Sequence, residues 1–293
     1  MKTAKILAIL TVLVLTLGLV AGCASTPAPA SGTPASSAAE SAASSEAASA
    51  PEKVVIRGIV DLVPHSELIE FVRPVLAEQG IEIDLVATAA DATSNERTAK
   101  GEADFNFFQH QPYLDTYNEA NSTKLVNVGD IHVEPITAYS DKFDSIDKLP
   151  DNAVIAIPND ASNEYRALRI LEENGFLKLN ADTATSLRAS LKDVTEFIRP
   201  LEIVELDSTQ IIPTKDDYDF FITNTNKALE AKITSARLFS EGGDSPYANI
   251  IAVTEANQNN PAILALVKAL QSEETRKFIE DKYNGAVIPA KLG

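Results

Sequence analysis

Apolar side chains follow two patterns along this chain: one unbroken run near the start, and short, spaced runs after residue 53. Residues 6–20 carry no charge and are mainly apolar, and two lysines precede them. A charged start, a short apolar stretch and small residues at its end are typical of a secretory signal. The stretch is short for a membrane span, which needs about 20 apolar residues. We therefore predict that residues 1–22 are a signal peptide.

The residues after the apolar run predict a lipid anchor and a tether. The sequence VAGC, which ends at Cys23, resembles the lipobox of bacterial lipoproteins, in which the cysteine is acylated and becomes the first residue. Several acyl chains on one residue attach a protein stably to a membrane. Residues 24–52 contain only small side chains, Pro and Glu, so we expect a disordered tether. The alternative is an ordinary signal with an incidental cysteine.

From residue 53 onward the pattern alternates between two periods. Alternating or continuous short apolar runs predict strands, and apolar residues three and four apart predict helices. The predicted strands are 54–60, 81–87, 104–108, 131–140, 153–158, 201–206, 219–223 and 248–254. The predicted helices are 65–79, 95–101, 112–121, 163–174, 227–232, 261–270 and 272–283. This alternation is typical of an α/β fold, here with mainly parallel sheets.

The strand and helix units fall into two sets, which predicts two lobes. We assign residues 53–140 and 247–293 to lobe 1, and residues 141–246 to lobe 2. The chain is then expected to cross between lobes near residues 139–142 and 243–248.

Composition restricts the partners. The chain has 25 Lys and Arg against 42 Asp and Glu, a net charge of −17. A polyanion binds nucleic acid and anionic lipid poorly, so we expect no nucleic-acid partner. Cys23 is the only cysteine, so no internal disulfide is available and the fold depends on packing.

The segment DFNFFQHQPYL, residues 104–114, places aromatic and polar side chains directly after a predicted strand. Ligands of α/β sheets bind at the carboxyl ends of strands, and small-molecule pockets combine aromatic walls with a few polar groups. Phe107, Phe108 and Tyr113 are each either core or pocket residues. His110 lies in the predicted strand-to-helix turn, which favours the pocket.

A second candidate lies in the segment IPNDASNEYR, residues 157–166. Ser162 or Asn163 is predicted to cap the next helix. Arg166 lies one turn in, where a guanidinium and a helix N-terminus together suit a carboxylate. A surface arginine that pairs with Glu164 or Glu173 is the alternative.

Asparagines follow two further strands. Asn224 and Asn226 either cap a helix or bind a ligand, and Asn249 lies where the chain is expected to cross between lobes. A metal site is an alternative, since histidine and carboxylate side chains bind zinc. The candidate ligands are His65, His110, His132 and Glu134, but their spacing matches no recognised zinc motif. Motifs for a nucleophilic serine, a P-loop or a dinucleotide are missing, so we predict no catalytic residue, metal or cofactor.

Several strings resemble the NlpA/MetQ family of methionine-binding lipoproteins, the substrate-binding components of ABC importers. They are FFQHQPYL at residues 107–114, HVEP at 132–135, IPND at 157–160, SPYAN at 245–249 and GAVIPA at 285–290. The resemblance implies a two-lobed periplasmic-binding-protein fold of type II, with mixed sheets flanked by helices and the ligand in the interlobe cleft. It also implies closure about a hinge, a permease and its ATPase subunit as partners, and a monomer without cofactor.

The resemblance also assigns roles. Arg166 would hold the carboxylate of an amino acid, and Asn163, Asn224 and Asn249 would bind its polar ends. His110, with Phe107 and Tyr113, would line the side-chain pocket, and Glu134 is a further member. Ala92 stands where the family commonly has an aromatic, so the ligand is methionine, a related amino acid or a short peptide.

Two other functions stay open at this point. A metal-binding transport lipoprotein predicts that His65, His110 and His132 lie together. A lipid-anchored enzyme predicts a nucleophile or an acid–base pair in the cleft.

Overall fold

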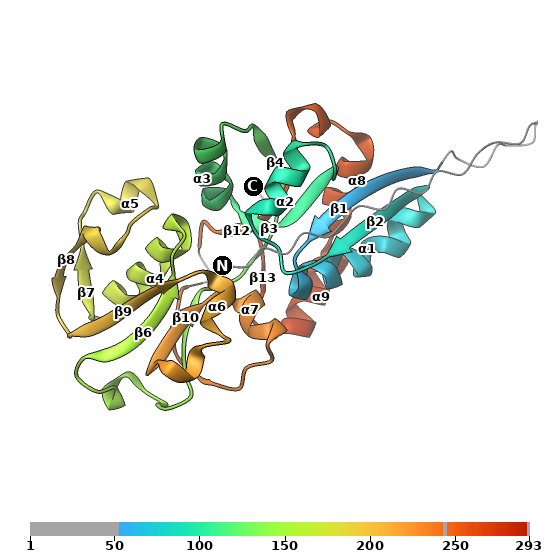
Figure 1. Cartoon of the computed structure of the whole chain (residues 1–293). Helices are drawn as coiled ribbons and strands as arrows, with labels where there is room; N and C mark the ends of the chain where they lie inside the picture. Colours follow the sequence, from blue (N-terminus) through green and yellow to red (C-terminus); the bar gives the residue numbers. More distant parts are fainter. Residues whose placement is uncertain (1–52, 243–244, 292–293) are drawn as a thin grey trace, which may run out of the picture. The chain divides into compact units, whose positions relative to one another are not determined.

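The computed structural model describes residues 53–242 and 245–291 (Figure 1). The predicted signal peptide, the predicted lipid site at Cys23 and the predicted tether lie outside the described residues.

The first of two larger sheets has six strands in the order β13-β4-β12-β3-β1-β2. Their bounds are β1 Val54–Val60, β2 Ile81–Ala87, β3 Phe105–His110, β4 Leu125–Val133, β12 Ala248–Thr254 and β13 Ile288–Pro289. β1, β2 and β3 run parallel, whereas β12 is antiparallel to both β3 and β4. The sheet is therefore mixed, and the prediction of mainly parallel sheets is wrong on this side of the molecule.

Helices cover the first sheet and bury its core. They are α1 Glu67–Glu78, α2 Ala92–Ala99, α3 Gln111–Asn121, α8 Pro261–Leu270 and α9 Glu273–Tyr283, with short turns η1 Leu62–Ser66 and η5 Glu255–Asn257. Leu68 and Leu76 of α1 and Leu266 of α8 are fully buried against Ile56 and Val60 of β1. Burial of such side chains stabilises the lobe by roughly 1.5–3 kcal/mol each.

The second sheet has five strands in the order β11-β5-β10-β6-β9, again with both parallel and antiparallel pairs. Its strands are β5 Thr137–Ser140, β6 Ala153–Pro158, β9 Leu201–Leu206, β10 Phe220–Thr223 and β11 Ala236–Ser240. A separate two-stranded antiparallel sheet pairs β7 Leu177–Leu179 with β8 Val194–Phe197. The helices and short turns of this lobe are α4 Ala161–Glu173, α5 Thr183–Ser186, α6 Ser208–Ile211, α7 Thr225–Glu230, η2 Ile146–Lys148, η3 Leu191–Asp193 and η4 Lys215–Asp217. Leu168 and Leu171 of α4 pack on Ile155 and Ile157 of β6.

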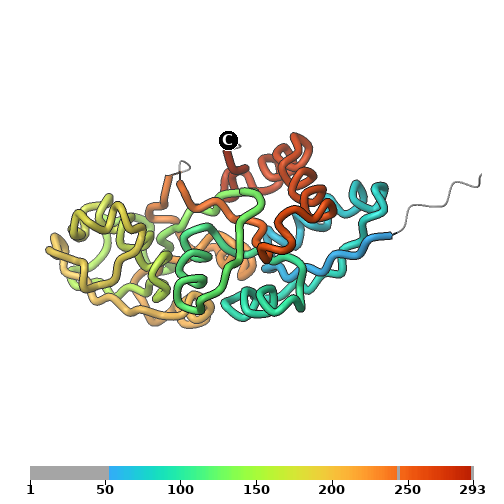
Figure 2. The backbone as a smooth tube through the Cα atoms, turned by 90° about the horizontal axis from the view of Figure 1, so that it is seen from above, coloured from blue at the N-terminus to red at the C-terminus, as the bar shows by residue number. Residues whose placement is uncertain are grey.

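The described chain passes between the sheets after β4 and again before β12, and the two segments run side by side (Figure 2). The backbone N–H of Glu241, just after β11, donates to the carbonyl of Ile136, 2.9 Å away. The predicted extended segment 131–140 is therefore two strands in different sheets. Residues 134–136 separate them, and Pro135 has no N–H to donate to a ladder. The first crossing lies a few residues before the predicted one.

Aspartates begin the helices that follow β2, β6 and β9. Asp91 caps α2, Asp160 caps α4 and Asp207 caps α6, each by accepting a hydrogen bond from a backbone N–H of the first turn. Such caps satisfy N–H groups that have no partner inside the helix. The prediction that Ser162 or Asn163 caps α4 is wrong, and α2 starts three residues before the predicted helix.

Candidate functional site

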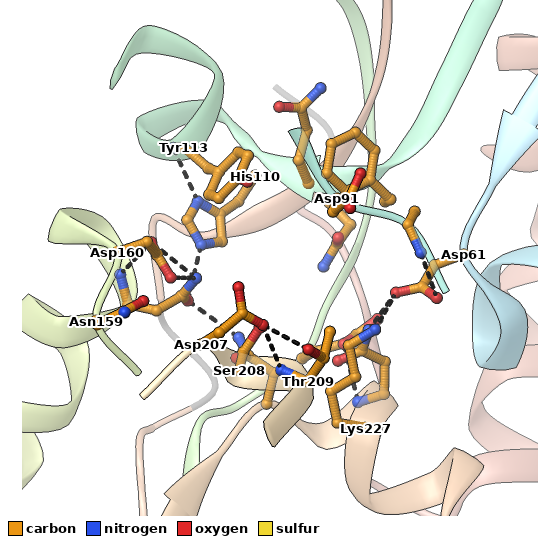
Figure 3. Close-up of a pocket in the computed structure, with 18 residues that line it drawn as sticks. Asp61, Asp91, His110, Tyr113, Asn159, Asp160, Asp207, Ser208, Thr209 and Lys227 are labelled. Carbon is orange, nitrogen blue, oxygen red and sulfur yellow. Dashed lines mark hydrogen bonds and ion pairs between the residues drawn. The ribbon is translucent and has the colours of Figure 1, made fainter. Parts of the chain in front are cut away.

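A cavity lies between the lobes, at the carboxyl ends of strands from both sheets (Figure 3). It holds about 710 Å³ of space free of protein atoms, part of it open to solvent. The walls come from the turns after β1, β2, β4, β6, β9 and β10, from the end of β3, from α3 and from β12. The cavity therefore lies where ligands of α/β sheets bind, at the carboxyl ends of the strands.

Six of the eight predicted ligand-binding residues line this cavity. They are Asn163, Asn249, Asn224, His110, Tyr113 and Glu134. Phe107 and Arg166 lie behind the walls.

Phe107 belongs to the core of the first lobe. Its side chain is fully buried and meets the rings of His65 and His132 edge-on, with centroids 4.6 and 5.4 Å away. Successive strand residues point to opposite faces, so its neighbour Phe108 lines the cavity instead. The sequence left core and pocket open for each of these rings, and the register of β3 decides between them.

Arg166 is buried beside the cavity, with 1 % of its side chain exposed. Its guanidinium donates to Glu241 Oε2 at 2.5 Å and to the carbonyl of Glu134 at 2.8 Å. Its carbon lies 4.4 Å from the centre of the Tyr247 ring. The surface pairing with Glu164 or Glu173 is therefore wrong. The counter-charge is Glu241, 75 residues along the chain, which no local pattern indicates.

Asn163 joins the two lobes at the wall of the cavity. Its Oδ1 accepts from Asn224 Nδ2 at 3.0 Å and from Arg166 at 3.2 Å, and lies 3.1 Å from His110 Nε2. Tyr113 N–H donates to His110 Nδ1, which leaves the ring proton on Nε2 to donate to Asn163. Burial, with the nearby Arg166 charge, lowers the pKa of His110 to about 3. His110 is therefore a neutral donor at physiological pH.

Glu134 and two histidines form the buried floor. Glu134 Oε1 lies 2.7 Å from His132 Nε2, and Oε2 accepts from the N–H of Asn226 at 3.1 Å. His65 Nε2 lies 3.1 Å from Asn249 Oδ1. Burial raises the pKa of Glu134 and lowers that of His132 to about 3.

These floor residues also bear on the metal hypothesis. One ligand atom from each of His65, His132 and Glu134 lies within 4.8 Å of the others, so these three could hold an ion. His110 is bonded to Asn163 instead, so the predicted grouping of all three histidines is wrong. The ring nitrogens that face Glu134 are used in hydrogen bonds within the floor.

Comparison with known proteins adds to this geometry. The family model for NlpA lipoproteins matches residues 58–291. This chain belongs to the NlpA lipoprotein family. Membrane lipoprotein TpN32 of Treponema pallidum is 35% identical over 231 residues, covering 78% of this chain and 85% of that one. The methionine-binding lipoprotein MetQ of Bacillus subtilis is 34% identical over 232 residues, covering 77% and 84%.

Solved structures of other proteins have the same fold as this chain. A nutrient-binding protein from Burkholderia cenocepacia, solved bound to methionine, has a TM-score of 0.77 and 36% identity, and the match covers 80% of this chain and 100% of that one. The predicted two-lobed periplasmic-binding-protein fold with mixed sheets is therefore confirmed.

Several wall residues of this NlpA lipoprotein were not predicted. Asp61 accepts from Lys227 Nζ at 2.9 Å and from Asn226 Nδ2 at 2.8 Å. Asp91 and Asp207 also line the cavity, whereas Ala92, the predicted site of altered specificity, does not. Each of these aspartates follows a strand directly or within a few residues, and that position alone could have identified them.

Proposed function

We propose that this chain is the substrate-binding lipoprotein of an ABC importer and binds an α-amino acid in the cavity between its lobes. The observation that carries the proposal is the convergence of polar side chains from both lobes on one cavity, through the bonds of Asn163 to Asn224 and His110. The names of relatives supply the ligand class, since the Bacillus subtilis relative is described as methionine-binding and the Burkholderia cenocepacia protein was solved bound to methionine.

The ends of an amino acid fit different parts of the cavity. The carboxylate suits the amides of Asn163 and Asn224, with the Arg166 guanidinium directly behind them. The ammonium suits the acidic side, where Glu134 and Asp61 line the wall. Charge-assisted hydrogen bonds of this kind are stronger than neutral ones.

Binding is proposed to proceed by closure about the two crossing segments. The hinge would lie at residues 134–136 and between β11 and β12, where the chain passes from one sheet to the other. A ligand can favour the closed state only through contacts that it makes better there, and this cavity offers contacts from both lobes. The closed protein then delivers the ligand to a permease, whose ATPase subunit supplies the energy.

The location follows the names of the relatives, one of which is a membrane lipoprotein and the other a lipoprotein. We propose attachment by a lipid on Cys23, outside the cytoplasmic membrane, and a monomeric receptor. Within the described residues, no helix is both long and apolar enough to cross a membrane.

Isothermal titration calorimetry with a panel of amino acids tests the ligand class. The same titration of a variant at Asn249 tests the location of the binding site. Asn249 is 5% exposed and lines the cavity, so Asn249→Ala is expected to weaken binding about tenfold or more through the lost hydrogen bonds. Asn259→Ala, an exposed residue outside the cavity, is the control and should bind as the wild type does. Equal affinity in both variants would place the ligand elsewhere.

A further inference from the structure

A buried ion pair joins the two lobes inside the cavity (Figure 3). Asp61 follows β1 of the first lobe, and Lys227 belongs to α7 of the second. Lys227 Nζ lies 2.9 Å from Asp61 Oδ2, and the two side chains are 12% and 2% exposed. Lys227 is the only lysine or arginine among the described residues that line the cavity. The pair therefore sets the charge that a ligand meets on this side of the cavity.

The carboxylate of Asp61 offers no free acceptor to a ligand. Its Oδ1 accepts from the backbone N–H groups of Leu62 and Ala90, at 2.8 and 3.4 Å. Its Oδ2 accepts from Asn226 Nδ2 at 2.8 Å and from the ammonium of Lys227. A carboxylate has about four acceptor positions, and these donors fill them. A ligand therefore meets Asp61 as one half of a neutral pair and not as a free anion.

Asn226 connects Asp61 to a second buried carboxylate, that of Glu134. Glu134 contacts the neutral imidazole of His132, at 2.7 Å, and the backbone N–H of Asn226, at 3.1 Å. Asn226 Oδ1 is also buried and finds no donor in the part of the chain that the structure describes. Buried acceptors are rarely left unpaired. Glu134 and Asn226 therefore suit one ammonium, which the α-amino group of an amino acid supplies.

The other carboxylates that line the cavity are open to water or already bonded. Asp91 and Asp207 are exposed, so solvent screens their charges. Asp160 is half-buried, and both of its oxygens accept hydrogen bonds from Asn163. The buried wall described here therefore has one free carboxylate, that of Glu134, for one ammonium of the ligand.

We propose that Lys227 determines the specificity of the site: because it neutralises Asp61, it excludes amino acids whose side chain is cationic. This inference rests on the proposed function. Ala90, one of the few apolar residues of the wall, donates its N–H to Asp61, so a side chain that follows this wall passes the Lys227 ammonium. A second ammonium on the ligand would meet a like charge there and find no free carboxylate, which lowers its affinity.

Titration calorimetry of the full chain, purified in detergent, tests the proposal with norleucine, methionine, lysine and ornithine. Norleucine has the carbon skeleton of lysine without its second ammonium. The wild type is expected to bind norleucine and methionine about tenfold or more tightly than lysine and ornithine. Lys227→Met leaves Asp61 without its counter-ion, and the second ammonium of a diamino acid can take that place. The ratio of norleucine affinity to that of the better-bound diamino acid is therefore expected to fall about tenfold or more in this variant.

Three further variants separate the effect of charge from that of structure. Asp61→Asn/Lys227→Met removes both charges and is expected to restore the preference for norleucine, since a second ammonium again finds no carboxylate. Lys227→Arg keeps the positive charge and is expected to keep the wild-type ratio. Lys178→Met is the matched control, because it removes a lysine from an exposed pair with Glu196, whose side chains are 57% and 55% exposed, and should not change the ratio.

The outcomes separate this inference from the proposed function. Lysine or ornithine binding to the wild type as tightly as norleucine overturns the inference and leaves the proposed function intact. An equal loss of affinity for all ligands in Lys227→Met, at a constant ratio, also overturns it, because the ion pair would then only hold the lobes together. A double variant that fails to restore the ratio excludes the charge of Asp61 as the cause. If no amino acid binds to the wild type, the proposed function itself fails.

Discussion

At the scale of single residues, Arg166 shows which contacts of a side chain the sequence can and cannot predict. Its position one turn into a helix predicted that it would hold the carboxylate of a ligand, whereas in the structure its guanidinium pairs with a carboxylate of the chain itself. The partner is a residue of the chain, Glu241, beside the segment that returns to the first lobe. Arg166 also bonds the carbonyl of Glu134 in the other crossing and contacts Tyr247. The guanidinium therefore ties together both segments that connect the lobes.

Removing Glu241 leaves this buried charge without a counter-ion. Glu241→Gln is expected to lower the free energy of unfolding by about 2–4 kcal/mol, since breaking a buried pair exposes the full desolvation cost of the remaining ion. Unfolding in urea measures this change in the free energy of unfolding. Glu196→Gln breaks the exposed pair with Lys178, whose side chains are 57% and 55% exposed, and should cost less than about 1 kcal/mol. Similar losses in both variants would show that the Arg166 pair is solvated.

At the scale of elements, prediction succeeded where burial dictates the pattern. The predicted bounds of β1, β2, β6, β9, β12 and α8 match the structure. The central strands β6 and β12 are almost fully buried, so their apolar runs are nearly continuous. The strands β7, β8 and β11 were not predicted. They are three to five residues long, and β8 is largely exposed, so pairing with a distant partner rather than local pattern defines them.

The helix α4 carries a carboxyl that should make the second lobe sensitive to pH. Burial, and then its contact with Glu205 on β9, raise the pKa of Glu164 from 4.5 to about 8. The folded state keeps a proton that the unfolded state releases, so the free energy of unfolding should fall as pH rises from about 4.5 to about 8.

Glu164→Gln removes this linkage. The variant is expected to match the wild type near pH 4.5 and to exceed its free energy of unfolding by about 1–2 kcal/mol at pH 8. Thermal unfolding across this pH range measures the difference. Glu202→Gln, an exposed change on β9, should keep the pH profile of the wild type. A Glu164→Gln profile that is also unchanged would mean that the carboxyl is ionised in the folded protein.

At the scale of the whole molecule, the alternation of strands and helices predicted the fold class and the side of the sheets on which the cavity lies. It did not predict the charge of the cavity. That charge depends on Asp61, Asp91 and Asp207, which come from three separate turns and meet only when both lobes are in place. Helix caps are common on surfaces, so an aspartate after a strand carries no sign of a ligand until its neighbours are known.

The proposed lipid anchor on Cys23 can be tested directly. If Cys23 carries the lipid, mass spectrometry of the N-terminal peptide should find an acylated cysteine as its first residue, and Cys23→Ser should abolish labelling with palmitate. Exchange of residues 1–23 for the signal of a secreted protein should release the chain from the membrane fraction and leave its affinity for ligand unchanged. Uptake should nevertheless fall, because an anchored receptor is held at a high effective concentration beside its permease. Undiminished uptake by the released form would show that encounter with the permease does not depend on the anchor.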